Sequence, residues 1–372
     1  MSFDQLLKHK LDTRRENDSF RVLRGNNLKF DFCSNDYLGL STNPHLLAVI
    51  EEEYAKTSQA IGSGGSRLLA GDNSYFHSLE DYLAFYHKGE SCLLFNSGFV
   101  ANLAVFATIP QRGDVVFYDE LIHACVKDGL RLGLAKHFSF RHNDLAHLEE
   151  KIKTSTGNQI FIALESVYSM DGDECLLNQF VVLAERYGAK IILDEAHTTG
   201  VCGEKGEGFA VQQNLSDQVF IRIHTFGKAI GAHGACVIAS QLVKDYLINF
   251  SRQFIYTTSA PLHSLIAVKC AYEFLEQNTA LITDLNSNIQ LFKDLSNLET
   301  GSNSAIQPVL IAGNTFVKAV ANTLQEHEFD VRPVLSPTVA IGAERLRICI
   351  HQNNTALEIK QLVSLLHILL KK

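Results

Sequence analysis

The residue best suited to covalent chemistry is Lys228, which stands among glycines and apolar residues in the segment 224–231 (HTFGKAIG). Removing a lysine side chain from water favours its neutral amine. A neutral amine attacks carbonyl groups, and an aldehyde cofactor such as pyridoxal phosphate is held as a Schiff base on such a lysine. Taken alone, the segment fits a solvated loop lysine better, so this prediction depends on what else the chain supplies.

Three further side chains have the types that contact the ring of such a cofactor. Asp194 follows the apolar run 190–193, and a carboxylate there can pair with a pyridinium nitrogen and keep the ring protonated. His197 can donate to the phenolic oxygen of the ring, and His123 can stack on its face. For each residue alone, a helix cap, an ion pair or a packed histidine is the alternative.

Other groups suit a phosphate. Ser169 and Thr225 supply hydroxyls, and Gly98 and Phe99 supply backbone N–H donors. The two backbone donors belong to a predicted strand, turn and helix over 91–102, and the N-terminus of a helix favours an anion. These residues predict a phosphate site that needs no lysine.

Residues 194–197 spell DEAH, which also occurs in helicases. Those enzymes additionally need the string G-x-x-x-x-G-K-[ST] for the nucleotide phosphates, and this sequence does not contain it. We therefore interpret Asp194 as a cofactor ligand.

The elements that position these residues alternate between strand and helix. Apolar runs predict strands, and amphipathic segments between them predict helices; the strands are 91–95, 115–118, 160–164, 190–193 and 219–223. This order indicates an α/β fold with a mostly parallel sheet and helices on both faces. Ligands bind beyond the carboxyl ends of such strands, and the candidate residues all lie just past those ends.

The composition excludes several classes of function. The chain has 372 residues, 46% of them hydrophobic and 20% charged, with a net charge of −8. This charge provides no overall attraction for nucleic acid or for an anionic membrane surface. Eight scattered cysteines form no metal-binding pattern and suit a reducing cytoplasm, and no apolar run is long enough for a membrane span. We expect a cytoplasmic protein without a metal site.

The length exceeds what one core usually covers, so we expect more than one domain. The prediction is an N-terminal arm over 1–40, a large cofactor-binding domain over 41–265, and a linker helix with a small α+β domain over 266–372. The linker is predicted as one long helical stretch that ends near residue 297.

Several segments together carry a specific resemblance that runs nearly from end to end: 32–40, 62–66, 96–102, 169–173, 194–197 and 225–228. Through them the chain resembles the α-oxoamine synthase family of pyridoxal-phosphate enzymes. The resemblance implies fold type I of these enzymes, the aspartate-aminotransferase-like fold. It also implies a homodimer with active sites at the interface between the subunits.

The resemblance assigns roles to the residues selected above. Lys228 becomes the Schiff-base lysine, with Asp194 on the pyridine nitrogen, His197 on the phenolic oxygen and His123 over the ring. Phosphate contacts are expected from Gly98, Phe99 and Thr225, with Ser169 also lining the site, and Thr257 or Thr258 reaching the phosphate of a partner subunit.

The resemblance also implies which residues bind the two substrates. Arg21 and Thr338 match positions that face the acyl substrate, and Arg347 matches the arginine that binds the amino-acid carboxylate. Alternation along the last strand places Arg345 on the same face, so the two arginines compete for this role.

The N-terminal segment 11–21 is similar to that of family members that condense L-alanine with a pimeloyl thioester, on CoA or acyl carrier protein. The implied products are 8-amino-7-oxononanoate, used for biotin synthesis, and CO₂. Two alternatives remain open. One is the same chemistry on other substrates, as in 2-amino-3-ketobutyrate ligase, 5-aminolevulinate synthase or a serine palmitoyltransferase-like enzyme. The other is a catalytically silent binding homologue.

Overall fold

A computed structural model describes residues 1–23, 25, 28–298 and 300–371, and these form two compact units. The larger unit comprises residues 36–169 and 174–283. The smaller unit comprises residues 1–35, 170–173 and 284–372, of which 24, 26–27, 299 and 372 lie outside the description. This division does not test the predicted domain limits at residues 40 and 265, which remain a prediction.

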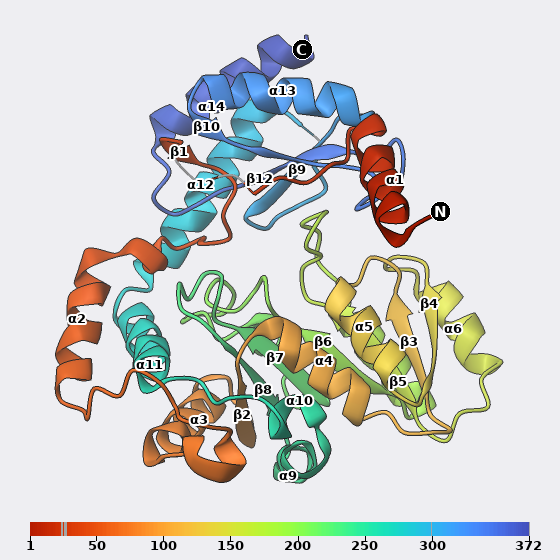
Figure 1. The fold of residues 1–372 in the computed structure, drawn as a ribbon, viewed down its shortest axis with the longest axis vertical. Helices are drawn as coiled ribbons and strands as arrows, with labels where there is room; N and C mark the ends of the chain where they lie inside the picture. Colours follow the sequence, from red (N-terminus) through yellow and green to blue (C-terminus); the bar gives the residue numbers. More distant parts are fainter. Residues whose placement is uncertain (24, 26–27, 299, 372) are drawn as a thin grey trace. The chain divides into compact units, whose positions relative to one another are not determined.

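The larger unit is organised around a seven-stranded sheet with the order β2-β8-β7-β6-β5-β3-β4 (Figure 1). The strands are β2 (Ser91–Phe95), β3 (Val115–Asp119), β4 (Lys136–Phe140), β5 (Ile160–Glu165), β6 (Lys190–Asp194), β7 (Ile221–Thr225) and β8 (Ala235–Ala239). Strand β8 runs antiparallel to both of its neighbours, and the other pairs in the sheet are parallel. The carboxyl ends of β3, β5, β6 and β7 therefore lie at one edge.

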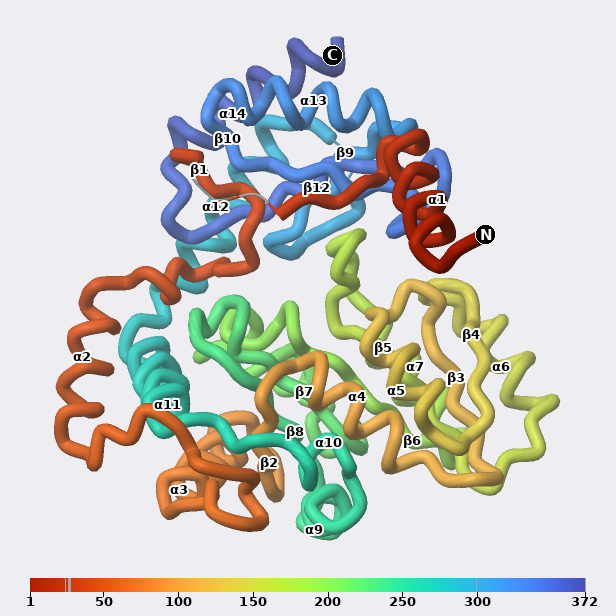
Figure 2. The backbone as a smooth tube through the Cα atoms, in the orientation of Figure 1, coloured from red at the N-terminus to blue at the C-terminus, as the bar shows by residue number. Residues whose placement is uncertain are grey.

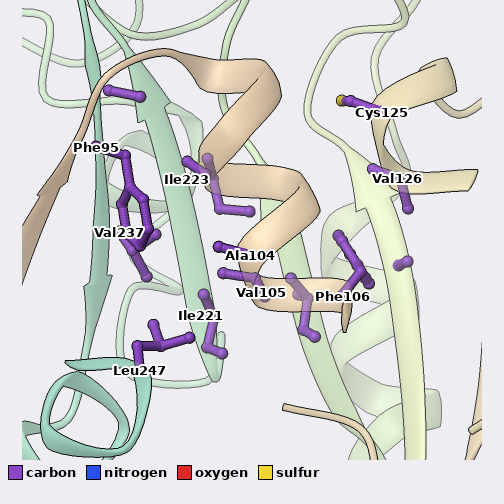
Figure 3. Packing of buried hydrophobic residues seen from close by; sticks show 14 of the residues in the cluster. Phe95, Ala104, Val105, Phe106, Cys125, Val126, Ile221, Ile223, Val237 and Leu247 are labelled. Carbon is purple, nitrogen blue, oxygen red and sulfur yellow. The ribbon is translucent and has the colours of Figure 1, made fainter. Parts of the chain in front are cut away.

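Successive side chains of a strand point to opposite faces of the sheet, so strands with uninterrupted apolar runs are buried on both faces. On β6, Ile192 joins one hydrophobic cluster, whereas Ile191 and Leu193 join another. Figure 3 shows the first cluster, where Val105 of the helix α4 (Gly98–Thr108) lies near Ile221 of β7. The two clusters pack helices against both faces of the sheet. The strand ends that carry polar residues are therefore rigidly supported.

Helices cover both faces of the sheet and flank it. They are α2 (Pro44–Ala55), α3 (Ser74–Tyr86), α4 (Gly98–Thr108), α5 (Ala124–Leu132), α6 (Leu145–Lys153), α7 (Leu177–Tyr187), α8 (Phe209–Gln212), α9 (Gln241–Phe250), α10 (Arg252–Ile255) and α11 (Leu262–Gln277), with a 3₁₀ turn at Leu40–Thr42 and a π turn at Arg67–Gly71. Helices α4 and α5 pack against each other and share the first cluster, whereas α6 and α7 belong to the second.

The smaller unit is an α+β arrangement. Its three-stranded antiparallel sheet has the order β11-β12-β9, formed by β9 (Ile306–Leu310), β11 (Arg332–Val334) and β12 (Arg345–Cys349). Strands β1 (Phe30–Asp31) and β10 (Phe329–Asp330) pair separately, so the early chain lies beside a late segment (Figure 2). The helices are α1 (Phe3–Glu16), α13 (Asn314–Glu326) and α14 (Ala356–Leu370), and α12 (Ala280–Ser296) crosses the division between the units.

The fold class predicted from the sequence is confirmed, with differences in detail. The predicted elements did not include the strands β4 and β8 or the helices α6, α8, α9 and α10. Strand β4 carries exposed residues and lacks the apolar signal of a buried strand. The predicted linker helix is wrong as a single element, because α11 ends at Gln277 and α12 begins at Ala280. Asn278 caps α11 through its backbone N–H, which bonds the carbonyl of Leu275.

No helix within the described residues is both long and apolar enough to cross a membrane.

Candidate functional site

The ends of the strands β5, β6 and β7 and the N-termini of the helices α4 and α5 line one cavity in the larger unit. Its empty volume, including the part open to solvent, is about 490 Å³, which lies in the range of small-molecule sites. The lining residues are Gly98, Phe99, Asn102, His123, Cys125, Glu165, Asp194, Ala196, His197, Thr225 and Lys228. Lys228, Asp194, both histidines and the phosphate candidates Gly98, Phe99 and Thr225, all selected from the sequence, therefore come together here.

Asp194 ends β6 and is 7% exposed. One carboxylate oxygen, Oδ2, accepts a hydrogen bond of 2.7 Å from Asn102 Nδ2, and the other, Oδ1, accepts one of 2.9 Å from the backbone N–H of Ala196. Asn102 comes from α4 and is itself buried. Both oxygens are thus oriented by neighbouring groups, which makes Asp194 a fixed negative charge in the cavity wall.

Lys228 and His197 form a hydrogen-bonded pair. The Nζ atom of Lys228 lies 2.8 Å from Nε2 of His197, and Nδ1 of the same ring lies 2.8 Å from the hydroxyl of Tyr37. His197 is buried, and its ring is held on both sides. A continuous chain of hydrogen bonds therefore leads from the lysine amine through an imidazole to a phenol.

His123 caps the N-terminus of α5. Its Nδ1 atom accepts a hydrogen bond of 3.2 Å from the backbone N–H of Cys125 and lies 2.9 Å from Sγ of that residue. An Nδ1 that accepts carries no proton, so the neutral ring is protonated at Nε2. Burial lowers the pKa of His123, the charge of Asp194 raises it, and that of Lys228 lowers it further.

The N-terminus of α4 forms the third side of the cavity. Ser97 caps this helix by accepting from the backbone N–H of Val100, and the earliest N–H groups of a helix have no acceptor within the helix. Gly98 allows close packing, because a Cβ atom there would lie 3.1 Å from Oγ1 of Thr225. These groups provide the setting for an anion that the sequence predicted.

Sequence reasoning missed four residues of this site, Glu165, Asn102, Cys125 and Tyr37. Glu165 is the last residue of β5 and pairs in register with Asp194, and it is 3% exposed. Burial and the charge of Asp194 raise its pKa to about 8. Its position at a strand end, like that of Asp194, is the sequence signal that could have found it.

Three other predicted cofactor residues are not among those lining the cavity. Ser169 is buried after β5, and its backbone N–H donates to Oε2 of Glu165 at 3.2 Å. Thr257 and Thr258 instead accept hydrogen bonds from Nδ2 of Asn96, through Oγ1 at 3.1 Å and the carbonyl oxygen at 2.8 Å. Their predicted contact with a partner subunit stays a prediction.

The predicted substrate residues belong to the smaller unit. Arg21 Nη2 donates to Thr338 Oγ1 at 3.2 Å, so these two predicted residues contact each other. The side chain of Arg345 is buried and forms an ion pair with Asp171, whereas Arg347 is half-buried and donates to Asn35 Oδ1 at 2.9 Å. The two competing arginines therefore differ in their surroundings.

Comparison with known proteins adds to this geometry. Residues 28–366 match the family described as "Aminotransferase class I and II". The chain belongs to this family.

Among its relatives in the aminotransferase class I and II family, an 8-amino-7-oxononanoate synthase from Emericella nidulans is 39% identical, over 90% of this chain and 87% of the relative. The crystal structure of an 8-amino-7-oxononanoate synthase from Francisella tularensis has a TM-score of 0.79 and 29% identity, over 93% of this chain and 99% of that one. A serine palmitoyltransferase from S. paucimobilis, with a bound PLP-myriocin aldimine, has a TM-score of 0.89 at 23% identity, over 99% and 97% of the chains. This last likeness shows the fold, which is fold type I of the pyridoxal-phosphate enzymes.

The cavity residues fit pyridoxal phosphate. The cofactor has an aldehyde, a basic ring nitrogen, a flat ring and a phosphate, and the cavity offers an amine, a buried carboxylate, two imidazoles and a helix N-terminus. Each chemical feature of the cofactor thus has a suitable counterpart among the groups that line the cavity of this family member.

Proposed function

We propose that this protein is a pyridoxal-phosphate-dependent acyltransferase that condenses L-alanine with a pimeloyl thioester. The thioester carbonyl carbon becomes bonded to the alanine Cα, while the carrier thiol and CO₂ leave, which gives 8-amino-7-oxononanoate for biotin biosynthesis. The observation that carries the proposal is the single cavity in which Lys228, His197, Asp194 and His123 meet. The 8-amino-7-oxononanoate synthase relative, which aligns over most of the chain, supports the choice of substrates.

The residues that would hold the cofactor follow from the site. Lys228 offers the amine for the aldehyde, Asp194 the carboxylate for the ring nitrogen, and His197 a donor for the phenolic oxygen. His123 would stack on the ring, and the backbone N–H groups of Gly98 and Phe99 would bind the phosphate, with Thr225 adding its hydroxyl. Ser169 is proposed to line the same site. When bound, pyridoxal phosphate withdraws electrons from the substrate carbon attached to the amine nitrogen.

The chain itself supplies orientation and proton transfer. Asn102 and the Ala196 N–H hold the carboxylate of Asp194, so its negative charge stays in place throughout the reaction. Lys228 is the proposed general base that takes the proton from the alanine Cα and later returns one to the product. His197, at 2.8 Å from the lysine amine, orients that amine.

We propose that residues of the smaller unit bind the two substrates. Arg347 would bind the alanine carboxylate as a guanidinium–carboxylate pair, and Arg21 and Thr338 would contact the acyl group. We also propose a homodimer in which Thr257 or Thr258 reaches the phosphate of the partner's cofactor. The eight cysteines are all free thiols, which suits the cytoplasm.

The test is a substrate panel on the purified protein. L-alanine, glycine and L-serine are each combined with pimeloyl, acetyl, succinyl and palmitoyl thioesters, on CoA and, for pimeloyl, also on acyl carrier protein. Product formation with alanine and a pimeloyl thioester is the expected result. Turnover with glycine or serine alone would assign the protein to another α-oxoamine synthase, and no turnover with any pair would favour a silent homologue.

Cofactor attachment is tested separately. Borohydride reduction of the yellow protein should leave a covalent pyridoxyl label on the peptide that contains Lys228, and Lys228→Ala should abolish the label. A label on another lysine would refute the role assigned to Lys228. Light scattering after size-exclusion chromatography measures the oligomeric state.

A further inference from the structure

Glu165 is a buried carboxyl group that no step of the proposed reaction uses. It ends β5, lines the cavity, and pairs in register with Asp194 on β6. A buried carboxyl group beside a second carboxylate is unfavourable unless its hydrogen bonds are satisfied. Its contacts therefore indicate what the group does.

The two oxygens of Glu165 bind two different loops. Oε1 accepts a hydrogen bond from the backbone N–H of His123, after β3, and Oε2 accepts one of 3.2 Å from the backbone N–H of Ser169, after β5. Both residues were selected for the cofactor site. One side chain thus fixes the backbone of two residues that the proposed function needs.

The imidazole of His123 is fixed from its other side. Cys125 presents both its backbone N–H, at 3.2 Å, and its Sγ, at 2.9 Å, to Nδ1. Because Nδ1 accepts from the backbone, the thiol is the donor in its own contact, and the remaining ring proton is at Nε2. Burial raises the pKa of the Cys125 thiol, which keeps it protonated as this role requires.

We propose that Glu165 and Cys125 are positioning residues for His123. Glu165 sets where the backbone of His123 stands, and Cys125 sets the orientation and the tautomer of its ring. The inference rests on the proposed function, in which His123 stacks on the cofactor, and it adds the two side chains through which the fold controls that residue.

The charges around Glu165 are consistent with this role. Burial and Asp194 raise its pKa to about 8, while Lys228 and the two backbone N–H bonds act in the opposite direction. Lys127 on α5 is a further cation in this region, and burial lowers its pKa while Glu165 raises it. Burial and the carboxylate of Asp194 thus favour the neutral form of Glu165, whereas its two backbone hydrogen bonds favour the charged form.

The experiment compares Glu165→Gln with Asp114→Asn. Asp114 is a matched control in the same unit, because its buried carboxylate also accepts one backbone N–H on each oxygen, from Gln111 at Oδ2 and from Gln159 at Oδ1. A side-chain amide has one acceptor oxygen where a carboxylate has two, so each variant loses one bond of the same kind. A general loss of stability should affect both variants alike.

The main readout is the ring of His123 in protein labelled with ¹⁵N-histidine, without cofactor, assigned with His123→Gln. We expect the wild-type ring to be the Nε2-protonated tautomer, and Glu165→Gln to shift and broaden its signals, whereas Asp114→Asn leaves them unchanged. In the loaded enzyme, kcat should fall tenfold or more in Glu165→Gln, with a smaller change in the KM for alanine. Unchanged His123 signals in Glu165→Gln, or equal changes in both variants, would overturn the role of Glu165.

Cys125 is tested with a conservative pair. Cys125→Ser keeps a donor at this position and should retain the His123 spectrum and most of the activity, whereas Cys125→Ala should shift the ring signals. Equal spectra for serine and alanine would refute the role of the thiol. If Glu165→Gln fails to fold, Glu165→Asp and the Cys125 pair still report on the ring. Because the spectra need no substrate, they remain decisive even if the condensation of alanine is not observed.

Discussion

Arg345 and Arg347 stand two residues apart on β12, and the structure gives them different expected roles. Arg345 is 6% exposed. Its guanidinium forms an ion pair with Asp171 and donates to the carbonyls of Ala343, at 2.9 Å, and Met170, at 3.3 Å. Arg347 is half-buried and donates to Asn35 Oδ1. We predict that Arg345 is structural and that Arg347 binds the carboxylate of alanine.

The perturbation is the substitution of each arginine by glutamine, which removes the charge and keeps a polar side chain. Removing one partner of a fully buried ion pair costs about 3–5 kcal/mol. The Asp171 side chain is 30% exposed, so water partly replaces the lost cation and the expected cost in Arg345→Gln is about 2 kcal/mol. Arg347→Gln, which leaves no buried carboxylate behind in the proposed role, should cost about 1 kcal/mol or less.

The effect on catalysis should be the reverse. Loss of hydrogen bonds to a charged group weakens binding by about 1.5–3 kcal/mol, which corresponds to roughly a tenfold to a hundredfold increase in the KM for alanine in Arg347→Gln. Arg345→Gln should change this KM by less than about threefold. Urea unfolding and initial rates at a saturating thioester concentration measure the two effects.

The reasoning is refuted if Arg345→Gln raises the KM for alanine as much as Arg347→Gln does. It is also refuted if Arg347→Gln is the less stable of the two variants. Either result would show that the ion pair with Asp171 does not restrict Arg345 to a structural role.

Three further predictions concern the cavity. The native pKa of Glu165 is raised from the ordinary 4.5 to about 8, so its stabilising contribution is complete below about pH 4.5 and is lost as the pH rises towards 8. In urea unfolding between pH 5 and 8, wild type should lose up to about 1.4 kcal/mol per pH unit more than Glu165→Gln, and parallel pH profiles would contradict this. Asn102→Leu removes the 2.7 Å bond to Asp194 and should weaken cofactor binding about tenfold in an absorbance titration; wild-type affinity would show that Asp194 needs no orientation by Asn102. Gly98→Ala places a Cβ 3.1 Å from Thr225 Oγ1 and should weaken cofactor binding several-fold, whereas the control Gly62→Ala, with nothing within 4 Å of its Cβ, should not.

Much of the site was predictable because its chemistry follows directly from local patterns. Asp194 and Thr225 end strands whose apolar runs are visible in the sequence, and His123 and Lys228 follow such strands closely. Since parallel strands present their carboxyl ends at one edge, residues of the right chemical type could be grouped without coordinates. The prediction of a pyridoxal-phosphate site depended on this grouping together with the resemblance of several motifs to one family.

The sequence by itself determined the alternation of strands and helices, the polar residues at the strand ends, and the amine suited to an aldehyde cofactor. Only the tertiary structure decided which side chains hold one another. Asn102 lies 92 positions from Asp194, and Tyr37 lies 160 positions from His197. The physical reason is that the strand order β2-β8-β7-β6-β5-β3-β4 differs from the chain order, so register and helix packing create contacts that no local pattern contains.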